Sequence, residues 1–400
     1  MTIFFLKFPL VPTLGGAEFH TLQLARYFTA SGHRVKLITS DQYLFRLFEK
    51  NNLTRKRLFV GWEPTGKWSL LLWPLTFLIA RRKLKKIIRA APPDSIFFCQ
   101  SLTEKLILPA LLTAYGLPLT TVFFLEHKIP GKWLKFNPLK FLYLKKTREV
   151  KLITVSNFAK QEFMKFGVGQ KNIEVIYPSI TPAIASPPRR TKQSQFTIGI
   201  LGRLDPEKAV LNFLQSVIPG LPARSEASGE GGIRNPSWKI LIAGRGKQEH
   251  EIKDFISIKN LESRIKILEF VYNLDEFFSQ ISVLAYPTKV PESFGLSILE
   301  ALSRGIPVIA NNLGAIPEII KHGENGYLIS PPRDPFGRTQ GHLEQNRNGG
   351  GETQEGVMWT KYLESLQTPS TYQNLSASAL ITAQSFSETK MFEGFNRLIT

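Results

Sequence analysis

Residues 283–312 read VLAYPTKVPESFGLSILEALSRGIPVIANN and contain one complete repeat of the predicted fold. A short apolar run, 283–286, leads into a loop with two prolines and then into an apolar stretch with helical spacing. Gly305 and Pro307 end that helix before a second apolar run begins. Short, continuously apolar strands separated by helices are typical of parallel sheets that are covered on both faces.

The same alternation of strand and helix runs through the whole chain of 400 residues. Six strand-like runs precede a proline-rich polar segment at 181–195, and six follow it. We therefore expect an α/β protein with two doubly wound parallel-sheet (Rossmann-like) domains, 1–180 and 196–385, joined by the linker 181–195. The segment 386–400 is expected to form a C-terminal helix with Ser387 as its cap.

Several segments depart from this pattern. Two Gly-rich polar stretches, 220–237 and 337–356, have too little apolar content to pack and are expected to be loop insertions. The apolar run 68–80 is too short to cross a bilayer and is interrupted by Pro74, so we expect no transmembrane segment. The N-terminal apolar run lacks a basic leader and enters a glycine turn, which predicts a strand and not a signal peptide.

Composition places the chain among globular proteins, since 43% of its residues are hydrophobic and 21% are charged. The single cysteine, Cys99, lies in the apolar run SIFFCQ and excludes a disulfide framework. A reducing, cytoplasmic location is the natural interpretation, with Cys99 as a small buried hydrophobic residue.

Nearly all of the net positive charge lies in the first half of the sequence. Residues 1–180 hold 28 Lys and Arg against 10 Asp and Glu, whereas the rest of the chain holds 23 against 22. Two basic clusters dominate, RRKLKKIIR at 81–89 and KWLKFNPLKFLYLKK at 132–146. Cations interleaved with aromatic residues suit an anionic membrane surface. A solvated helix face with long lysine stems would explain either cluster equally well.

Ligands of open parallel sheets bind beyond the carboxyl ends of the strands, so the residues after each strand are the candidates for a site. After the first strand, Gly15 and Gly16 precede a helix and would let backbone N–H groups approach a phosphate or sugar. After the fourth strand, His127 could bond a sugar hydroxyl or relay a proton. A tight turn and a structural histidine are the simpler explanations of these two features.

The second half opens with a strand that is followed by GRLDPEK, residues 202–208. Arg203 and Lys208 place two cations at a strand end and a helix start, an arrangement that suits a diphosphate. The acidic residues between them could instead pair locally with either cation.

The helix in the opening stretch is expected to run from residue 294 or 295 to Arg304. Its first free N–H groups form an anion site and belong to Phe294, Gly295 and Leu296. Glu292 lies in the loop before the helix, where it would contact sugar hydroxyls or positive charge on a sugar ring. Glu300 could accept hydrogen bonds from ribose hydroxyls, or pair with Arg304 four residues later.

The run from Pro291 to Pro331 resembles the signature of the retaining, nucleotide-sugar-dependent glycosyltransferases of the GT-B fold, of the group 1 or family 4 type. Further matches are GGAE, SGHRVKLIT, VSNFAKQEF, GRLDPEK and LIAGRGK, so the resemblance covers nearly the whole chain. One departure is Ala209, where the family usually has glycine. Alanine suits a helix start, so this departure is expected to be neutral.

The resemblance implies a nucleotide-diphosphate sugar donor that is bound mostly by the second domain. Arg203 and Lys208 would hold the diphosphate with the N–H groups of the FGL run, Glu300 the ribose, and Glu292 the transferred sugar. His127 and the Gly15–Gly16 loop would approach from the first domain. A glycan or lipid-linked acceptor is expected, with peripheral binding at the inner face of the membrane, and retention by front-face attack.

Other classes of function remain open at this stage. The sequence contains no Asp-x-Asp pair, so we expect neither a catalytic metal nor another cofactor besides the donor substrate. A nucleotide-sugar epimerase could use the same fold. A basic nucleic-acid-binding protein would fit the pI near 9.9, but its basic stretches match no recognised reading motif, so no nucleic-acid partner is expected. A catalytically silent membrane scaffold would tolerate replacement of both glutamates.

Overall fold

The computed structural model describes residues 1–12, 14–180, 196–220, 238–268, 271, 273–330 and 353–399. The predicted linker and most of the two predicted insertions lie outside these residues. The end of the second insertion is helical where a loop is predicted, because Thr353 caps a helix that begins at Gln354. The chain divides into two compact units, Met1–Ser179 with Glu388–Thr400, and Ile180–Ser387.

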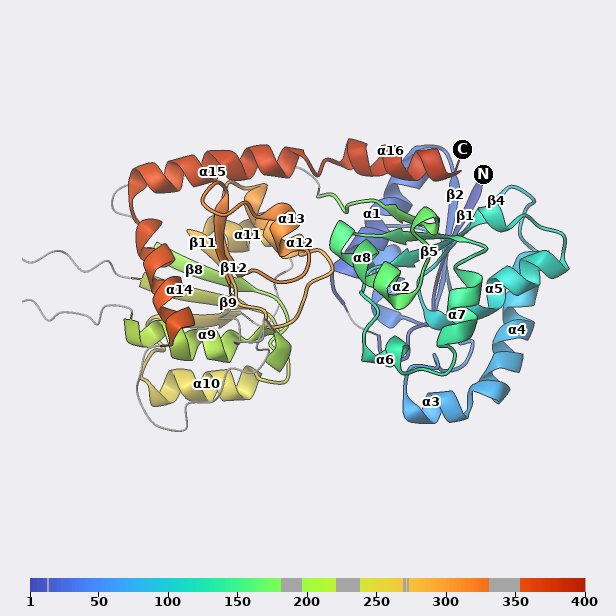
Figure 1. The fold of residues 1–400 in the computed structure, drawn as a ribbon, viewed down its shortest axis with the longest axis horizontal. Helices are drawn as coiled ribbons and strands as arrows, with labels where there is room; N and C mark the ends of the chain where they lie inside the picture. Colours follow the sequence, from blue (N-terminus) through green and yellow to red (C-terminus); the bar gives the residue numbers. More distant parts are fainter. Residues whose placement is uncertain are drawn as a thin grey trace, which may run out of the picture. The chain divides into compact units, whose positions relative to one another are not determined.

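Seven parallel strands form the sheet of the first unit, in the order β3-β2-β1-β4-β5-β6-β7 (Figure 1). They are β1 (Thr2–Lys7), β2 (Arg34–Thr39), β3 (Arg55–Arg57), β4 (Ser95–Cys99), β5 (Val122–Glu126), β6 (Lys151–Thr154) and β7 (Ile173–Val175). Apolar runs predict all of them except β3, whose sequence RKR has no apolar residue. Along β1, Phe4 and Leu6 enter one core while Ile3 and Phe5 enter the other, as the alternation of a strand requires.

Helices cover both faces of this sheet. They are α1 (Gly16–Ala30), α2 (Gln42–Lys50), α3 (Lys67–Leu71), α4 (Trp73–Arg89), α5 (Leu102–Ala114), α6 (Lys132–Lys135), α7 (Lys140–Lys146), α8 (Asn157–Phe166) and α16 (Glu388–Ile399). Phe392 of α16 stacks on Tyr27 of α1, with the ring centroids 3.5 Å apart, and Phe395 is fully buried. The C-terminal helix therefore contributes to the core of the N-terminal unit and is not a separate segment.

The apolar run 68–80 and the basic run 81–89 form α3 and α4, with Pro74 in the first turn of α4. The buried residues of α4 recur every three or four positions and are Trp73, Thr76, Ala80, Leu84 and Ile88. This spacing buries one face of the helix against the core, and Figure 1 shows α4 on the outer side of α5. In the parts of the chain that the structure describes, no helix is both long and apolar enough to cross a membrane.

Six parallel strands form the sheet of the second unit, in the order β10-β9-β8-β11-β12-β13. They are β8 (Phe196–Leu201), β9 (Trp238–Ala243), β10 (Ile265–Leu268), β11 (Val283–Tyr286), β12 (Val308–Asn311) and β13 (Gly326–Ile329). The helices are α9 (Val210–Val217), α10 (Glu249–Ile258), α11 (Leu274–Ser279), α12 (Leu296–Leu302), α13 (Ile316–Ile319), α14 (Gln354–Ser365) and α15 (Pro369–Gln384). The predicted pair of doubly wound parallel sheets is confirmed.

Both sheets reverse their strand order around their own first strand. β1 lies between β2 and β4, and β8 lies between β9 and β11. In open parallel sheets, ligands bind outside the carboxyl ends of the strands at such a switch point. The loops that follow β8 and β11 therefore hold the candidate site of the second unit, and those that follow β1, β4 and β5 hold that of the first.

Candidate active site

The loop after β8 is held against the loop after β9 by close backbone packing. The N–H of Leu204 donates to the carbonyl of Arg245 over 2.9 Å, and a Cβ atom on Gly244 would clash with the carbonyl oxygen of Gly202. Gly244 also has a φ of 149°, in the region that favours glycine. The close contact between Gly202 and Gly244 therefore holds the GRLDPEK loop at the carboxyl end of the sheet.

Arg203 pairs with acidic residues of its own loop. Its guanidinium donates to Asp205 and, over 2.7 Å, to Oε1 of Glu207, while the side chain stays 51% exposed. The local pairing that the sequence left open is thus present. Such exposed pairs contribute little to stability, so Arg203 can exchange its partners for a ligand at small cost.

Lys208 forms an ion pair with Glu292, which joins the loop after β8 to the loop after β11. The two side chains are only 19% and 17% exposed. Nζ of Lys208 also lies 5.7 Å from the ring centroid of Tyr286, the last residue of β11. The structure thus brings together two predicted site residues that are 84 positions apart in the sequence.

Tyr286 is a member of this cluster that the sequence does not reveal. Its side chain is buried, and burial, with the nearby negative charge of Glu292, raises the pKa of the phenol well above 10. The hydroxyl is therefore neutral and can act as a hydrogen-bond donor beside the carboxylate. Its position at the end of an apolar strand is the only signal in the sequence that could have indicated it.

The backbone of Glu292 is fixed by a glycine in the loop after β12. Gly314 forms an isolated parallel bridge with Glu292, and the N–H of Ala315 donates to the Glu292 carbonyl over 2.9 Å. Gly314 has a φ of 66°, and a Cβ atom there would clash with the backbone of Glu292. This contact orients Glu292 independently of its side-chain partner.

The helix after Glu292 is shorter than predicted. α12 runs from Leu296 to Leu302, two residues short of Arg304, and Gly295 caps it with a φ of 113°. The side chain of Phe294 is buried against Phe386, with the ring centroids 5.7 Å apart. Only the backbone of the FGL run is therefore available to a ligand at Phe294.

Glu300 makes the local ion pair that competes with its predicted role. Its Oε2 lies 2.6 Å from Nη1 of Arg304, and Arg304 also pairs with Asp275 over 2.7 Å. Burial raises the pKa of Glu300, while Arg304 opposes that shift. One carboxylate oxygen is thus used by the protein in this state.

The replacement of the family's usual glycine by Ala209 affects stability more than expected. It does precede α9, but its φ of 54° lies in the left-handed region that glycine adopts without a steric penalty. An alanine held there costs about 1 kcal/mol. The side chain is 1% exposed, so part of this cost is offset by burial of the methyl group.

In the first unit, Gly15 caps α1 with an extended backbone, and Gly16 begins the helix. The first turn of α1 already holds a carboxylate, because the buried Glu18 pairs with Lys7 at the end of β1. Oδ2 of Asp41 lies 3.7 Å from Nζ of the same lysine. Any anion at the predicted Gly15–Gly16 site would therefore lie near a protein cation that already faces two carboxylates.

His127 follows β5 and is in contact with a second histidine, His20 of α1. Nδ1 of His20 lies 2.9 Å from Nε2 of His127, and the two rings are nearly perpendicular. Glu126, the residue before His127, points into the unit, where it pairs with Lys105 over 2.7 Å and accepts a hydrogen bond from Tyr143. His20 is the partner that the sequence does not reveal.

Among the residues that the structure describes, no group of three or more His, Cys, Asp or Glu side chains could hold a metal ion.

The fold is similar to that of HepE of Anabaena, which was solved in complex with UDP. That structure matches 99% of this chain and 99% of its own, with a TM-score of 0.74 and 18% identity. The fold is thus that of a GT-B glycosyltransferase. Family models agree: "Glycosyl transferases group 1" matches residues 185–336, and "Glycosyltransferase Family 4" matches residues 14–183. The chain belongs to the group 1 glycosyltransferases of this fold.

Relatives with curated names match only part of the chain. The lipopolysaccharide core biosynthesis mannosyltransferase LpsB of Rhizobium meliloti is 29% identical over 33% of this chain and 36% of its own length. An uncharacterized glycosyltransferase of Methanocaldococcus jannaschii is 28% identical over 47% of this chain and 49% of its own. The chain thus spans less than half of the length of these relatives.

Proposed function

We propose that this protein transfers a sugar from a nucleotide-diphosphate sugar to a glycan or lipid-linked acceptor, with retention of anomeric configuration and without a metal ion. The observation that carries the proposal is the ion pair of Lys208 with Glu292 at the switch point of the second sheet, with Arg203 on the same loop as Lys208. HepE was crystallised with UDP and with UDP-glucose, which supports a nucleotide sugar as the donor class.

Donor binding would exchange partners within this cluster. Lys208 and Arg203 leave their carboxylates and bind the oxygens of the diphosphate, with help from the N–H groups of residues 294–296. Glu292 is then released to accept hydrogen bonds from the hydroxyls of the transferred sugar. Glu300, oriented by Arg304, accepts hydrogen bonds from the ribose.

In the transfer step, the bond between C1 of the sugar and the diphosphate oxygen breaks. The acceptor oxygen forms its bond to C1 on the same face, and its proton passes to the leaving phosphate oxygen. No separate protein base is required. His127 is neutral, because burial lowers its pKa well below 6.5, and it acts on the sugar through a hydrogen bond. Lys208 and Arg203 stabilise the negative charge that develops on the leaving group, which is commonly the largest electrostatic contribution.

A donor panel followed by product analysis tests this proposal. UDP-, GDP- and ADP-sugars are screened by thermal shift, because a ligand that binds only the folded protein raises its melting temperature. Products with the stabilising donor are then assigned by NMR with and without EDTA. We expect a glycoside with the anomeric configuration of the donor, at equal rates in both samples. An inverted product, a dependence on metal, or an epimerised donor would each contradict the corresponding part of the proposal.

We further propose that the first unit binds an anionic membrane surface at the cytoplasmic face. Six large apolar side chains on α3, on α4 and at the residue between them are 36% to 79% exposed: Trp68, Leu71, Leu72, Leu75, Leu78 and Ile79. In the described part of the chain, the exposed Arg81, Arg82 and Lys86 next to them have no ion-pair partner. An apolar face that is flanked by free cations fits the interface of an anionic bilayer.

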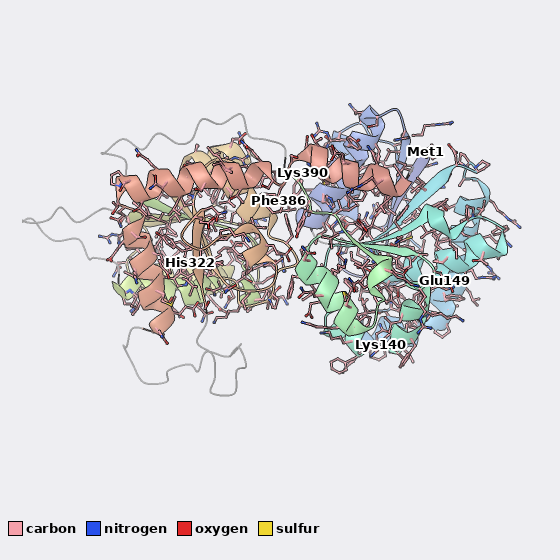
Figure 2. The ribbon with its side chains drawn as sticks, turned by 45° about the horizontal axis from the view of Figure 1, so that its top comes forward. Met1, Lys140, Glu149, His322, Phe386 and Lys390 are labelled. Carbon is pink, nitrogen blue, oxygen red and sulfur yellow. The ribbon has the colours of Figure 1, made fainter. Side chains whose placement is uncertain are left out.

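The second basic cluster also presents aromatic rings. Phe136 and Phe141 are 81% and 75% exposed. Lys140, labelled at the margin of the first unit in Figure 2, has its Nζ 5.7 Å from the centroid of Phe141. This cluster thus repeats the combination of exposed ring and cation.

Liposome co-sedimentation tests the membrane proposal. We compare the wild type with Arg81/Arg82/Lys86→Gln and with Trp68/Leu71/Leu75→Ser, at rising anionic lipid content. A matched control changes three exposed lysines of the second unit, Lys253/Lys259/Lys266→Gln. Only the first two variants should lose binding, and salt should weaken it as the Debye length falls from about 10 Å at 0.1 M to about 3 Å at 1 M. Wild-type sedimentation of both variants would contradict the proposal.

A further inference from the structure

The contact between His20 and His127 is a hydrogen bond between two imidazole rings. The separation of 2.9 Å between Nδ1 of His20 and Nε2 of His127 is typical of such a bond. A neutral imidazole carries one N–H donor and one bare nitrogen, so one ring donates to the other. Which ring donates decides which nitrogen of His127 carries its proton.

Both rings are neutral near pH 7. Burial lowers the pKa of His20 to about 4 and that of His127 well below 6.5. His20 and the nearby cations Lys7, Lys105 and Lys128 lower the pKa of His127 further. Two arrangements remain, with the bonding proton on either His20 or His127.

The surroundings of His20 distinguish these arrangements. Its Nε2 is buried and has no hydrogen-bond partner among the described residues, and its ring lies 6.2 Å from that of the fully buried Phe395 of α16. If His127 donated, His20 would carry its own proton on Nε2, as a buried N–H without a partner. Buried N–H groups without a partner are rarer than unpaired acceptors. The arrangement in which His20 donates is therefore favoured.

We propose that His20 is a positioning residue that donates from Nδ1 to Nε2 of His127 and thereby holds His127 as the Nδ1–H tautomer. His127 is half-buried at the carboxyl end of β5, and its Nδ1 bonds to no other described residue. That atom is then a hydrogen-bond donor toward an oxygen of the sugar substrate and not a proton acceptor. This role rests on the proposed function, whereas the tautomer itself does not.

Nitrogen-15 NMR of the imidazoles tests the tautomer without any substrate, and the chain has only six histidines. In the wild type we expect the proton of His127 on Nδ1 at pH 7. His20→Asn should preserve this state, because the amide nitrogen of asparagine is attached to Cγ as Nδ1 is in histidine. His20→Leu should release it, so that both tautomers of His127 are populated. A wild-type His127 with its proton on Nε2 would overturn the inference.

Kinetics with the donor that the thermal-shift panel identifies test the consequence for transfer. His20→Leu should lower kcat/KM about tenfold, the scale of one lost hydrogen bond, whereas His20→Asn should restore most of it. His250→Leu, at a side chain that is 88% exposed, is the control and should change neither measurement. Equal activity of His20→Leu and wild type would overturn the positioning role. An Nδ1–H tautomer in a chain that transfers no sugar from any donor would overturn the proposed function instead.

Discussion

Charged residues at the carboxyl ends of the two sheets differ in their access to water. In the first unit, Lys105 and Glu126 are 3% and 8% exposed, and Tyr143 completes the hydrogen bonding of the carboxylate. In the second, Lys208 and Glu292 are 19% and 17% exposed, and Arg203 is 51% exposed. An enclosed charge must keep its partner, because its desolvation is compensated only by that partner. A partly exposed charge can exchange its partner for a ligand.

The largest effect is expected for the enclosed pair of the first unit. Lys105→Met should lower the free energy of unfolding by about 3–5 kcal/mol, because it leaves Glu126 buried without its cation. Urea unfolding followed by circular dichroism measures the change. Lys208→Met is the matched control in the second unit and should cost much less. An unchanged unfolding midpoint for Lys105→Met would remove the distinction between the two pairs.

Catalytic activity, in contrast to stability, should depend most on the partly exposed pair of the second unit. Lys208→Met and Glu292→Gln should each lower kcat by at least ~100-fold with little change in unfolding, the scale for loss of one transition-state stabiliser. The double variant should fall by less than the product of the single effects, since the two side chains act together. Lys253→Met, which breaks an exposed pair on α10, should leave the rate unchanged. Near-normal turnover of either single variant would refute the site assignment.

Glu104 of α5 should make the stability of the first unit depend on pH. Burial raises its pKa to about 8, above the ordinary value of 4.5. Between these values the folded chain binds a proton that the unfolded chain has lost, so stability falls as pH rises from about 5 to 8. The slope from this one group is at most about 1.4 kcal/mol per pH unit. Glu104→Gln should flatten the pH profile of urea unfolding, and an equally steep profile in that variant would contradict the assignment.

The smallest effect is expected at Glu300. Glu300→Ala should weaken donor binding about tenfold and leave kcat nearly unchanged, because ribose contacts are equal in the ground and transition states. Titration calorimetry with the donor and steady-state rates separate the two quantities. Asp275→Ala, which removes the other partner of Arg304, controls for loss of the ion pair itself. A large fall in kcat at unaltered donor affinity would contradict the ribose role.

Much of the fold was predictable because it depends on local periodicity. The apolar runs that become β1, β4 and β8 can each be recognised from a few consecutive residues, since both faces of these strands are buried. The three-residue β3 was not predictable, because an edge strand is held by its backbone. Nor was the assignment of α16 to the first unit, which depends on packing against α1, more than 350 residues earlier in the chain.

The candidate site was predictable in part. Arg203, Lys208, Glu292 and Glu300 follow strands or lie on the helix after them, and strand ends are where such sheets bind ligands. Tyr286 was missed because, in the sequence, a tyrosine at the end of an apolar strand cannot be distinguished from an ordinary core residue. Ala209 was misjudged because a positive φ cannot be read from an alanine.

The sequence by itself determined the two parallel sheets and the residues at the strand ends, because periodicity and spacing are local properties of the chain. Its motifs, by their resemblance, also indicated the family. Tertiary structure alone decided the partners that are distant in the sequence: Lys208 with Glu292, Arg304 with Asp275, and His20 with His127. The reason is that a pairing depends on which loops the strand order brings together and on how much water the packing leaves. Both follow from contacts between residues that are distant in the sequence.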